Sequence, residues 1–142
     1  MKGSKDILSS ILKTTQMGQI GIRSVLKNPL HNNLRQELTA QLKEYNGIEQ
    51  EAHRIAQSRG WELKELDPAI KGMTNMMTMT RLSFGNIDSK AAKMMIQGNT
   101  RGIIKGYKNL NQFPRTDQRI ANLAQKLIDY EESNNHKLQG FL

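Results

Sequence analysis

The chain has 142 residues, with 21 lysines and arginines against 13 aspartates and glutamates, so its formal net charge is +8. It has no cysteine, which excludes disulfides, zinc ribbons and thiol nucleophiles. Only 37% of the residues are hydrophobic, and no run approaches the ~18 continuous apolar residues of a membrane span. We therefore expect a cytoplasmic protein without a transmembrane segment, folded as a single domain over residues 1–142.

Apolar residues recur at helical spacing in four long segments, and prolines or glycines mark the breaks between them. The first segment ends before Pro29, because the residue that precedes a proline avoids the helical conformation. Gly60 follows the second, as is common just past a helix end, and Pro114 separates the last two. The expected long helices cover, in chain order, residues 4–28, 32–59, 88–111 and 115–140.

The connection over residues 60–86 is long enough to cross the length of a helical bundle. Within it, the apolar spacing predicts a shorter helix over about 68–84. Trp61, the only tryptophan, is expected to pin the start of the connection to one end of the bundle. The first and last connections are short and the middle one is long. This order predicts an all-α, ferritin-like four-helix bundle, in which two up-down pairs are joined by a long crossover.

Four segments together resemble an uncharacterised bacterial family of small ferritin-like four-helix-bundle proteins. They read QMGQIGIRSVLKNP, QLKEYNGIEQEAHRIAQSRG, MMIQGNTRGIIKGYKNLNQFP and LAQKLIDYEESNNHKLQGFL. The most specific parts are TQMGQIGI at 15–22 and MIQGNTRGII at 95–104. The resemblance covers nearly the whole chain. It implies a four-helix bundle and an intracellular location, and it implies no particular activity.

The residues of a ferritin-type di-iron site are largely missing. Such a site needs a glutamate from each of two helices and a Glu-x-x-His pair from each of the other two. The corresponding triplets here read Gln50-x-x-His53 and Ser133-x-x-His136. Asn99 stands at the centre of the apolar stripe of the third long helix, where a glutamate would be needed. We therefore expect no di-iron cofactor.

Three possible metal ligands survive, namely Glu49, His53 and Glu131. Together they define an alternative hypothesis, a weak site for iron, manganese or zinc in a redox or storage protein. The interpretation that we favour is that the two glutamates either extend their carboxylates to solvent or pair with lysine and arginine, and that His53 lies on the surface.

Glycines recur every four residues within the third long helix, at Gly98, Gly102 and Gly106. Each costs about 1 kcal/mol relative to alanine inside a helix, which suggests a compensating close approach of another backbone. Gly18 and Gly21 of the first helix are the candidates to face them. We expect close packing inside the bundle, with a subunit interface and a ligand groove as the alternatives.

Methionines cluster in the crossover, where Met73, Met76 and Met77 lie on several faces of the predicted short helix. Methionine fills irregular apolar spaces and adapts to different partners. These residues, with the three glycines of the third long helix, are the predicted surface for close packing or self-association as a homodimer.

Residues 71–119 contain nine basic and two acidic residues, so most of the positive charge is concentrated there. Helical spacing places much of it along one face, opposite the buried stripe. This basic ridge consists of Lys90, Lys93, Arg101, Lys105, Lys108, Arg115 and Arg119. It suits an anionic protein or a nucleic acid, although a charged helix face is more often simply solvated.

Enzymatic activity is not expected, because no nucleophile elbow, phosphate-binding loop or convincing serine–histidine–acid set is present. The favoured function is a non-enzymatic scaffold or interaction protein without di-iron ligands. The alternatives are the weak metal-binding protein and the binder of a nucleic acid or another anionic partner through the basic ridge.

Overall fold

The computed structural model describes residues 3–66, 86–113 and 115–142. Their secondary structure is entirely helical, which confirms the prediction of an all-α, four-helix protein. The helices are α1 (Ser4–Val25), α2 (Asn32–Ser58), α4 (Ile87–Gln112) and α5 (Gln118–Gln139). Their bounds differ from the expected ones by at most three residues. The predicted short helix over 68–84 lies outside the described residues, as do Met73, Met76 and Met77.

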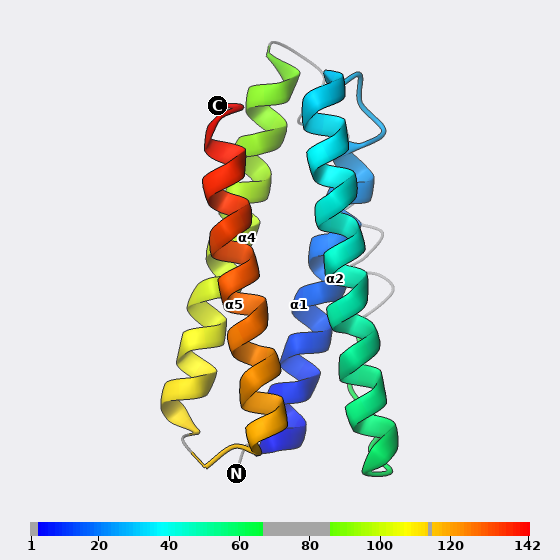
Figure 1. Ribbon diagram of the computed structural model, residues 1–142, viewed down its shortest axis with the longest axis vertical. Helices are drawn as coiled ribbons and strands as arrows, with labels where there is room; N and C mark the ends of the chain where they lie inside the picture. The colour runs from blue at the N-terminus through cyan, green and yellow to red at the C-terminus, as the bar shows by residue number, and fades with distance from the viewer. Residues whose placement is uncertain (1–2, 67–85, 114) are drawn as a thin grey trace.

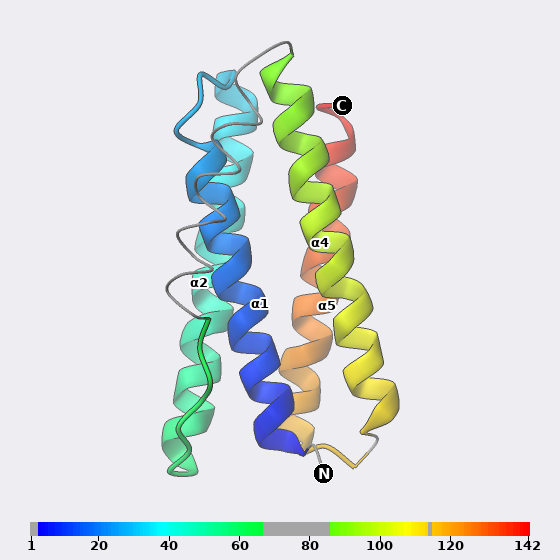
Figure 2. The ribbon, with the colours of Figure 1, turned by 180° about the vertical axis from the view of Figure 1, so that it is seen from behind.

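The helices form one elongated bundle in which α1 and α5 run in one direction and α2 and α4 in the other (Figures 1 and 2). Helix α1 packs against α2 and α4, and α5 packs against α4 and α2. At one end, the His31 backbone N–H, just before α2, donates to Asp88 Oδ1 on α4 at 3.1 Å. At the other end, the Asp117 backbone N–H donates to Ser4 Oγ at 2.9 Å. Helix α2 therefore ends at the opposite end of the bundle from the start of α4.

Local sequence signals set several helix ends. The Asn86 side chain caps α4 by accepting a hydrogen bond from the Ser89 N–H at 3.2 Å, and Asp117 caps α5 in the same way. Gly60 has a φ of 66°, the left-handed conformation in which a helix commonly ends at glycine. The chain after α2 then runs back along α1, where the Leu66 N–H donates to Gln16 Oε1 at 3.2 Å.

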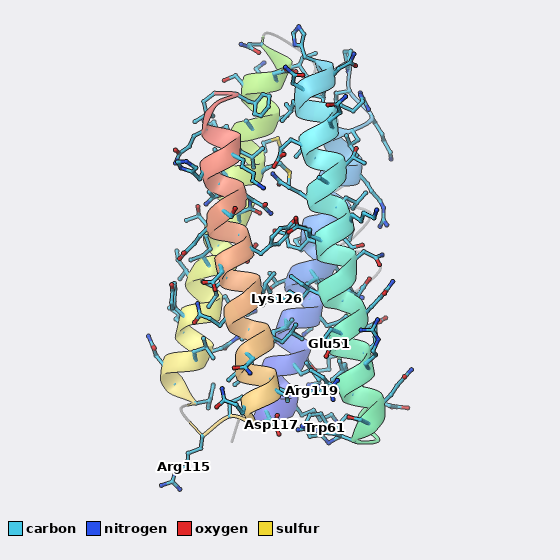
Figure 3. All side chains as sticks on the ribbon, in the orientation of Figure 1. Glu51, Trp61, Arg115, Asp117, Arg119 and Lys126 are labelled. Carbon is cyan, nitrogen blue, oxygen red and sulfur yellow. The ribbon has the colours of Figure 1, made fainter. Side chains whose placement is uncertain are left out.

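Ion pairs connect α2 and α5 at the end of the bundle where α2 stops (Figure 3). The Arg119 guanidinium donates to Glu51 Oε1 at 3.0 Å, and Arg59 lies 2.8 Å from the Asp117 carboxylate. The Arg59 guanidinium also lies over the ring of Trp61, which is half-buried and packs against the core. The expectation that Trp61 pins the connection to the bundle end is confirmed.

Aliphatic side chains from all four helices fill the bundle, because each helix buries one apolar stripe. None of the described helices is long and apolar enough to cross a membrane. The fully buried side chains include Leu8, Ile22, Leu38, Ile55, Ala92 and Ile120.

Candidate functional site

Three polar side chains meet in the middle of the apolar core and form what we call the polar centre: Tyr45 from α2, Asn99 from α4 and Glu131 from α5. Each is at most 2% exposed. The Tyr45 hydroxyl oxygen lies 2.7 Å from Asn99 Oδ1 and 2.9 Å from Glu131 Oε2. The ring of Tyr45 also meets that of Tyr130 edge to face, with centroids 5.5 Å apart. The polar centre thus ties three helices together.

Burial, together with the single proton of Tyr45, favours the protonated form of Glu131. The Tyr45 hydroxyl has one proton and cannot donate to both neighbours. With Glu131 neutral, its carboxyl O–H donates to the Tyr45 oxygen, and Tyr45 donates to Asn99. Burial raises the pKa of Glu131 to about 8, although the hydrogen bond that Tyr45 can donate to the ionised carboxylate acts in the opposite direction. Burial also raises the pKa of Tyr45 well above its usual value, so the polar centre is mainly uncharged at neutral pH.

Glycines make room for the two largest members of the polar centre. A Cβ atom at Gly18 of α1 would come within 2.7 Å of the Tyr45 ring. A Cβ atom at Gly102 of α4 would come within 2.5 Å of both carboxyl oxygens of Glu131. The Tyr45 ring and the Glu131 carboxyl therefore each lie against a glycine of a neighbouring helix, where no side chain intervenes.

Two buried atoms of the polar centre have no hydrogen-bond partner among the described residues. They are Asn99 Nδ2, a donor, and Glu131 Oε1, which is an acceptor when Oε2 carries the proton. Leaving such a group unpaired costs about 1–3 kcal/mol in a protein interior. These atoms therefore have the capacity to hydrogen-bond a water molecule or a ligand.

A pocket of about 560 Å³ opens between α1 and α4 and reaches the polar centre. Its inner end is formed by the buried side chains of Tyr45, Asn99 and Glu131. Its walls are mainly apolar and include Val25, Met94 and Met95, and its outer part includes three basic side chains. Known small-molecule sites of proteins are typically about 300–1,000 Å³ and apolar, with a few convergent polar groups. The three basic residues are Lys13, Arg101 and Lys105.

The glycine prediction is confirmed in part. Gly18 and Gly21 line the same pocket as Gly98 and Gly102, but their Cβ positions face the side chains of Tyr45 and Met95 and not the glycines of α4. Gly102 is closely packed as expected, and so is Gly106, where a Cβ atom would come within 2.6 Å of Ile128. Close packing is wrong for Gly98, because no described atom lies within 4 Å of the position that its Cβ would take. Gly98 instead opens onto the pocket.

The three predicted metal ligands each contact a different side chain. Glu49 accepts a hydrogen bond from Gln19 Nε2 at 3.2 Å, and His53 Nε2 lies 3.9 Å from a Glu65 oxygen. Within the described part of the chain, no three histidine or acidic side chains are grouped so that they could hold a metal ion. Glu131 instead forms a hydrogen bond with the Tyr45 hydroxyl. These donors do not fit a ferritin-type di-iron centre, which requires several facing carboxylates.

The residues of the basic ridge have different surroundings. Arg101 and Lys105 line the pocket, whereas Lys93 and Lys108 are exposed on α4 outside it and Lys90 is half-buried. The side chain of Arg115 extends away from the end of the bundle (Figure 3). Arg119 is paired with Glu51, so the ridge does not continue as free charge onto α5.

Fold and site together define the class of protein: an all-helical four-helix bundle with a buried polar centre open to a pocket between α1 and α4. Comparisons with protein-family models, curated proteins and solved structures find no match for this chain.

Proposed function

We propose that this protein is a non-enzymatic small-molecule-binding protein built on a ferritin-like bundle, with the ligand held in the pocket between α1 and α4. The observation that carries the proposal is the pair of buried, unpartnered atoms, Asn99 Nδ2 and Glu131 Oε1, at the inner end of this pocket. A bundle evolved only for packing is expected to fill such a space or to satisfy these atoms internally.

The arrangement of the helices supports the ferritin-like part of the proposal. Helices α1 and α5 run one way and α2 and α4 the other, as in bundles with one long crossover, whose ligand sites lie between facing helices. The absence from the sequence of a recognisable nucleophile or phosphate-binding motif supports binding over catalysis. Two further functions stay predictions. One is self-association as a homodimer, and the other is binding of an anionic macromolecule by the exposed part of the basic ridge.

Two matched glycine substitutions test the pocket. Gly98 lines it, and Gly47 lies on the exposed side of α2; neither has a described atom within 4 Å of its Cβ position. We expect Gly98→Phe to block the pocket and Gly47→Phe to leave it open. Both variants should fold, because replacing a helical glycine by phenylalanine gains a few tenths of a kcal/mol in helix propensity.

The probe is N-phenylnaphthylamine, an uncharged dye that becomes fluorescent in apolar sites. It should bind the wild-type protein and Gly47→Phe saturably with one dye per chain, whereas Gly98→Phe should bind at least about tenfold more weakly. Absence of saturable binding to the wild type, or equal binding to both variants, would contradict the proposed function.

A further inference from the structure

The two ends of the pocket differ in chemistry, and this difference restricts what can bind there. The inner end is uncharged and polar, the walls are apolar and the outer part is basic. Building on the proposed function, we infer that the ligand is an amphipathic organic anion that carries a hydroxyl or amide group at the end opposite its negative charge.

The inner end selects for a neutral group that both donates and accepts a hydrogen bond. Asn99 Nδ2 requires an acceptor, and in the neutral state with the proton on Glu131 Oε2, Glu131 Oε1 requires a donor. A hydroxyl group or an amide supplies both functions. A carboxylate does not, since it only accepts hydrogen bonds, and no described cation lies within ion-pair distance of Glu131 to offset a second buried acid.

The outer part of the pocket selects for negative charge. Lys13 is half-buried there, and Arg101 and Lys105 are exposed. Within the described ranges, none of the three lies within ion-pair distance of a carboxylate, so their charges are available to a ligand. Arginine and lysine are common partners of carboxylates and phosphates, and a site shielded from bulk water strengthens the pairing.

The middle of the pocket fits the apolar part of a ligand, and its lining does not select one particular shape. Met17, Met94 and Met95 contribute flexible thioether side chains, and the glycines of α1 and α4 that line the pocket add no side chains. Methionine walls adapt to different apolar shapes. The restriction on the ligand is therefore set by its two ends more than by its middle.

Four matched naphthalenes separate these requirements: a hydroxynaphthoate with its hydroxyl and carboxylate on opposite rings, a naphthoate without the hydroxyl, a naphthol without the carboxylate, and naphthalene itself. Each competes with N-phenylnaphthylamine at about 150 mM salt, where distant surface charges are largely screened. We expect the hydroxynaphthoate to bind at least about tenfold more tightly than the naphthoate or the naphthol, and naphthalene to bind most weakly.

Two double variants, each removing two positive charges from α4, locate the charge recognition. Arg101→Gln/Lys105→Gln changes the pocket, and Lys93→Gln/Lys108→Gln changes exposed residues that do not line it. The first should weaken hydroxynaphthoate binding by about tenfold and leave naphthol binding unchanged. The second should change the affinity of either compound by less than about twofold.

The outcomes separate this inference from the proposed function. If the dye binds but the naphthol competes as well as the hydroxynaphthoate, the inferred ligand class is wrong and the binding function stands. If the two double variants weaken hydroxynaphthoate binding equally, the recognition of charge does not occur in the pocket and the inference is also overturned. If neither the dye nor any naphthalene binds, the pocket holds water only and both proposals fail.

Discussion

The carboxyl group of Glu131 on α5 lies directly against Gly102 of α4, so closely that a Cβ atom there would come within 2.5 Å of both carboxyl oxygens. This contact explains a glycine in the interior of a helix, where it costs about 1 kcal/mol relative to alanine. The space left by the missing side chain admits Glu131 to the polar centre, where it meets Tyr45. Gly18 of α1 admits the Tyr45 ring in the same way.

Replacing Gly102 by alanine should destabilise the protein, although alanine is the better helix former. The new methyl group would displace the carboxyl of Glu131 and break its hydrogen bond to Tyr45. We expect the free energy of unfolding in urea to fall by about 1–3 kcal/mol, the usual cost of leaving buried polar groups unpaired.

Gly98→Ala is the matched control for this substitution. It lies one helical turn away on α4, with no described atom within 4 Å of the new methyl group. It should raise the free energy of unfolding by up to about 1 kcal/mol. Equal effects of the two substitutions would show that the contact between Gly102 and Glu131 has no energetic importance.

Glu131→Gln should remove a dependence of stability on pH. The amide keeps the shape of the carboxyl and donates to Tyr45 as the protonated acid does. As pH rises above the ordinary glutamate pKa of 4.5, unfolded chains lose this proton, whereas the folded protein retains it up to a pKa of about 8. The folded state then binds more protons, so its stability falls as pH rises.

Urea unfolding of both proteins between about pH 5 and pH 9 measures this effect. The stability advantage of Glu131→Gln should be small at the acid end, grow by up to about 1.4 kcal/mol per pH unit, and level off above the folded-state pKa. A difference between the two proteins that stays constant with pH would mean that Glu131 titrates normally in the folded protein.

Tyr45→Phe keeps the ring against Gly18 and removes the hydroxyl that connects Asn99 to Glu131. We expect a loss of about 1–3 kcal/mol in the free energy of unfolding, because both buried partners lose their hydrogen bond. The pKa of Glu131 should rise further, since the ionised carboxylate would lose the hydrogen bond that Tyr45 can donate to it. The pH at which the stability levels off should therefore move upward.

Tyr130→Phe is the control for the loss of a hydroxyl. The Tyr130 hydroxyl donates to the Gln41 backbone carbonyl at 3.0 Å but is only partly buried. Its removal should cost about 0.5–1.5 kcal/mol and leave the titration of Glu131 in place. A smaller cost for Tyr45→Phe than for Tyr130→Phe would argue against the polar centre as a stabilising unit.

Arg119→Gln at the end of the bundle should have a small effect. Hydrogen bonds from Arg119 and then Arg54 lower the pKa of Glu51, but both arginines are exposed and Glu51 is only partly buried, and ion pairs in contact with solvent are weak. We expect thermal unfolding to show a loss below about 1 kcal/mol that shrinks further at high salt. A loss that high salt leaves unchanged would indicate a role other than charge pairing.

The helices could be predicted from the sequence because their signals are local. Apolar spacing defines the buried stripes, and Pro29, Gly60 and Pro114 mark breaks that depend only on neighbouring residues. The order of short and long connections was also sufficient to predict the all-α bundle. The predicted end of the first helix is three residues too late: α1 ends at Val25 with Leu26 as its cap, and Lys27 and Asn28 form tighter turn hydrogen bonds with Ser24 and Val25 before Pro29.

The polar centre could be predicted only in its parts. The sequence predicts Asn99 on a buried stripe, but it groups Glu131 with Glu49 and His53 as a possible metal ligand. Tyr45 and Glu131 are 86 residues apart in the sequence. Their contact depends on how far α2 and α5 are shifted along the bundle axis relative to each other, and no local sequence pattern encodes this shift. Polar residues on several inward stripes were the available signal.

The most direct measurement is carbon-13 NMR of the Glu131 side-chain carboxyl during titration with the hydroxynaphthoate, its resonance assigned by its loss in Glu131→Gln. At neutral pH it should have the shift of a mainly protonated acid and move as the probe saturates the wild-type protein and Gly47→Phe. In Gly98→Phe it should not move. Saturable binding without a change at Glu131, or the same change in Gly98→Phe, would contradict a ligand site at the polar centre.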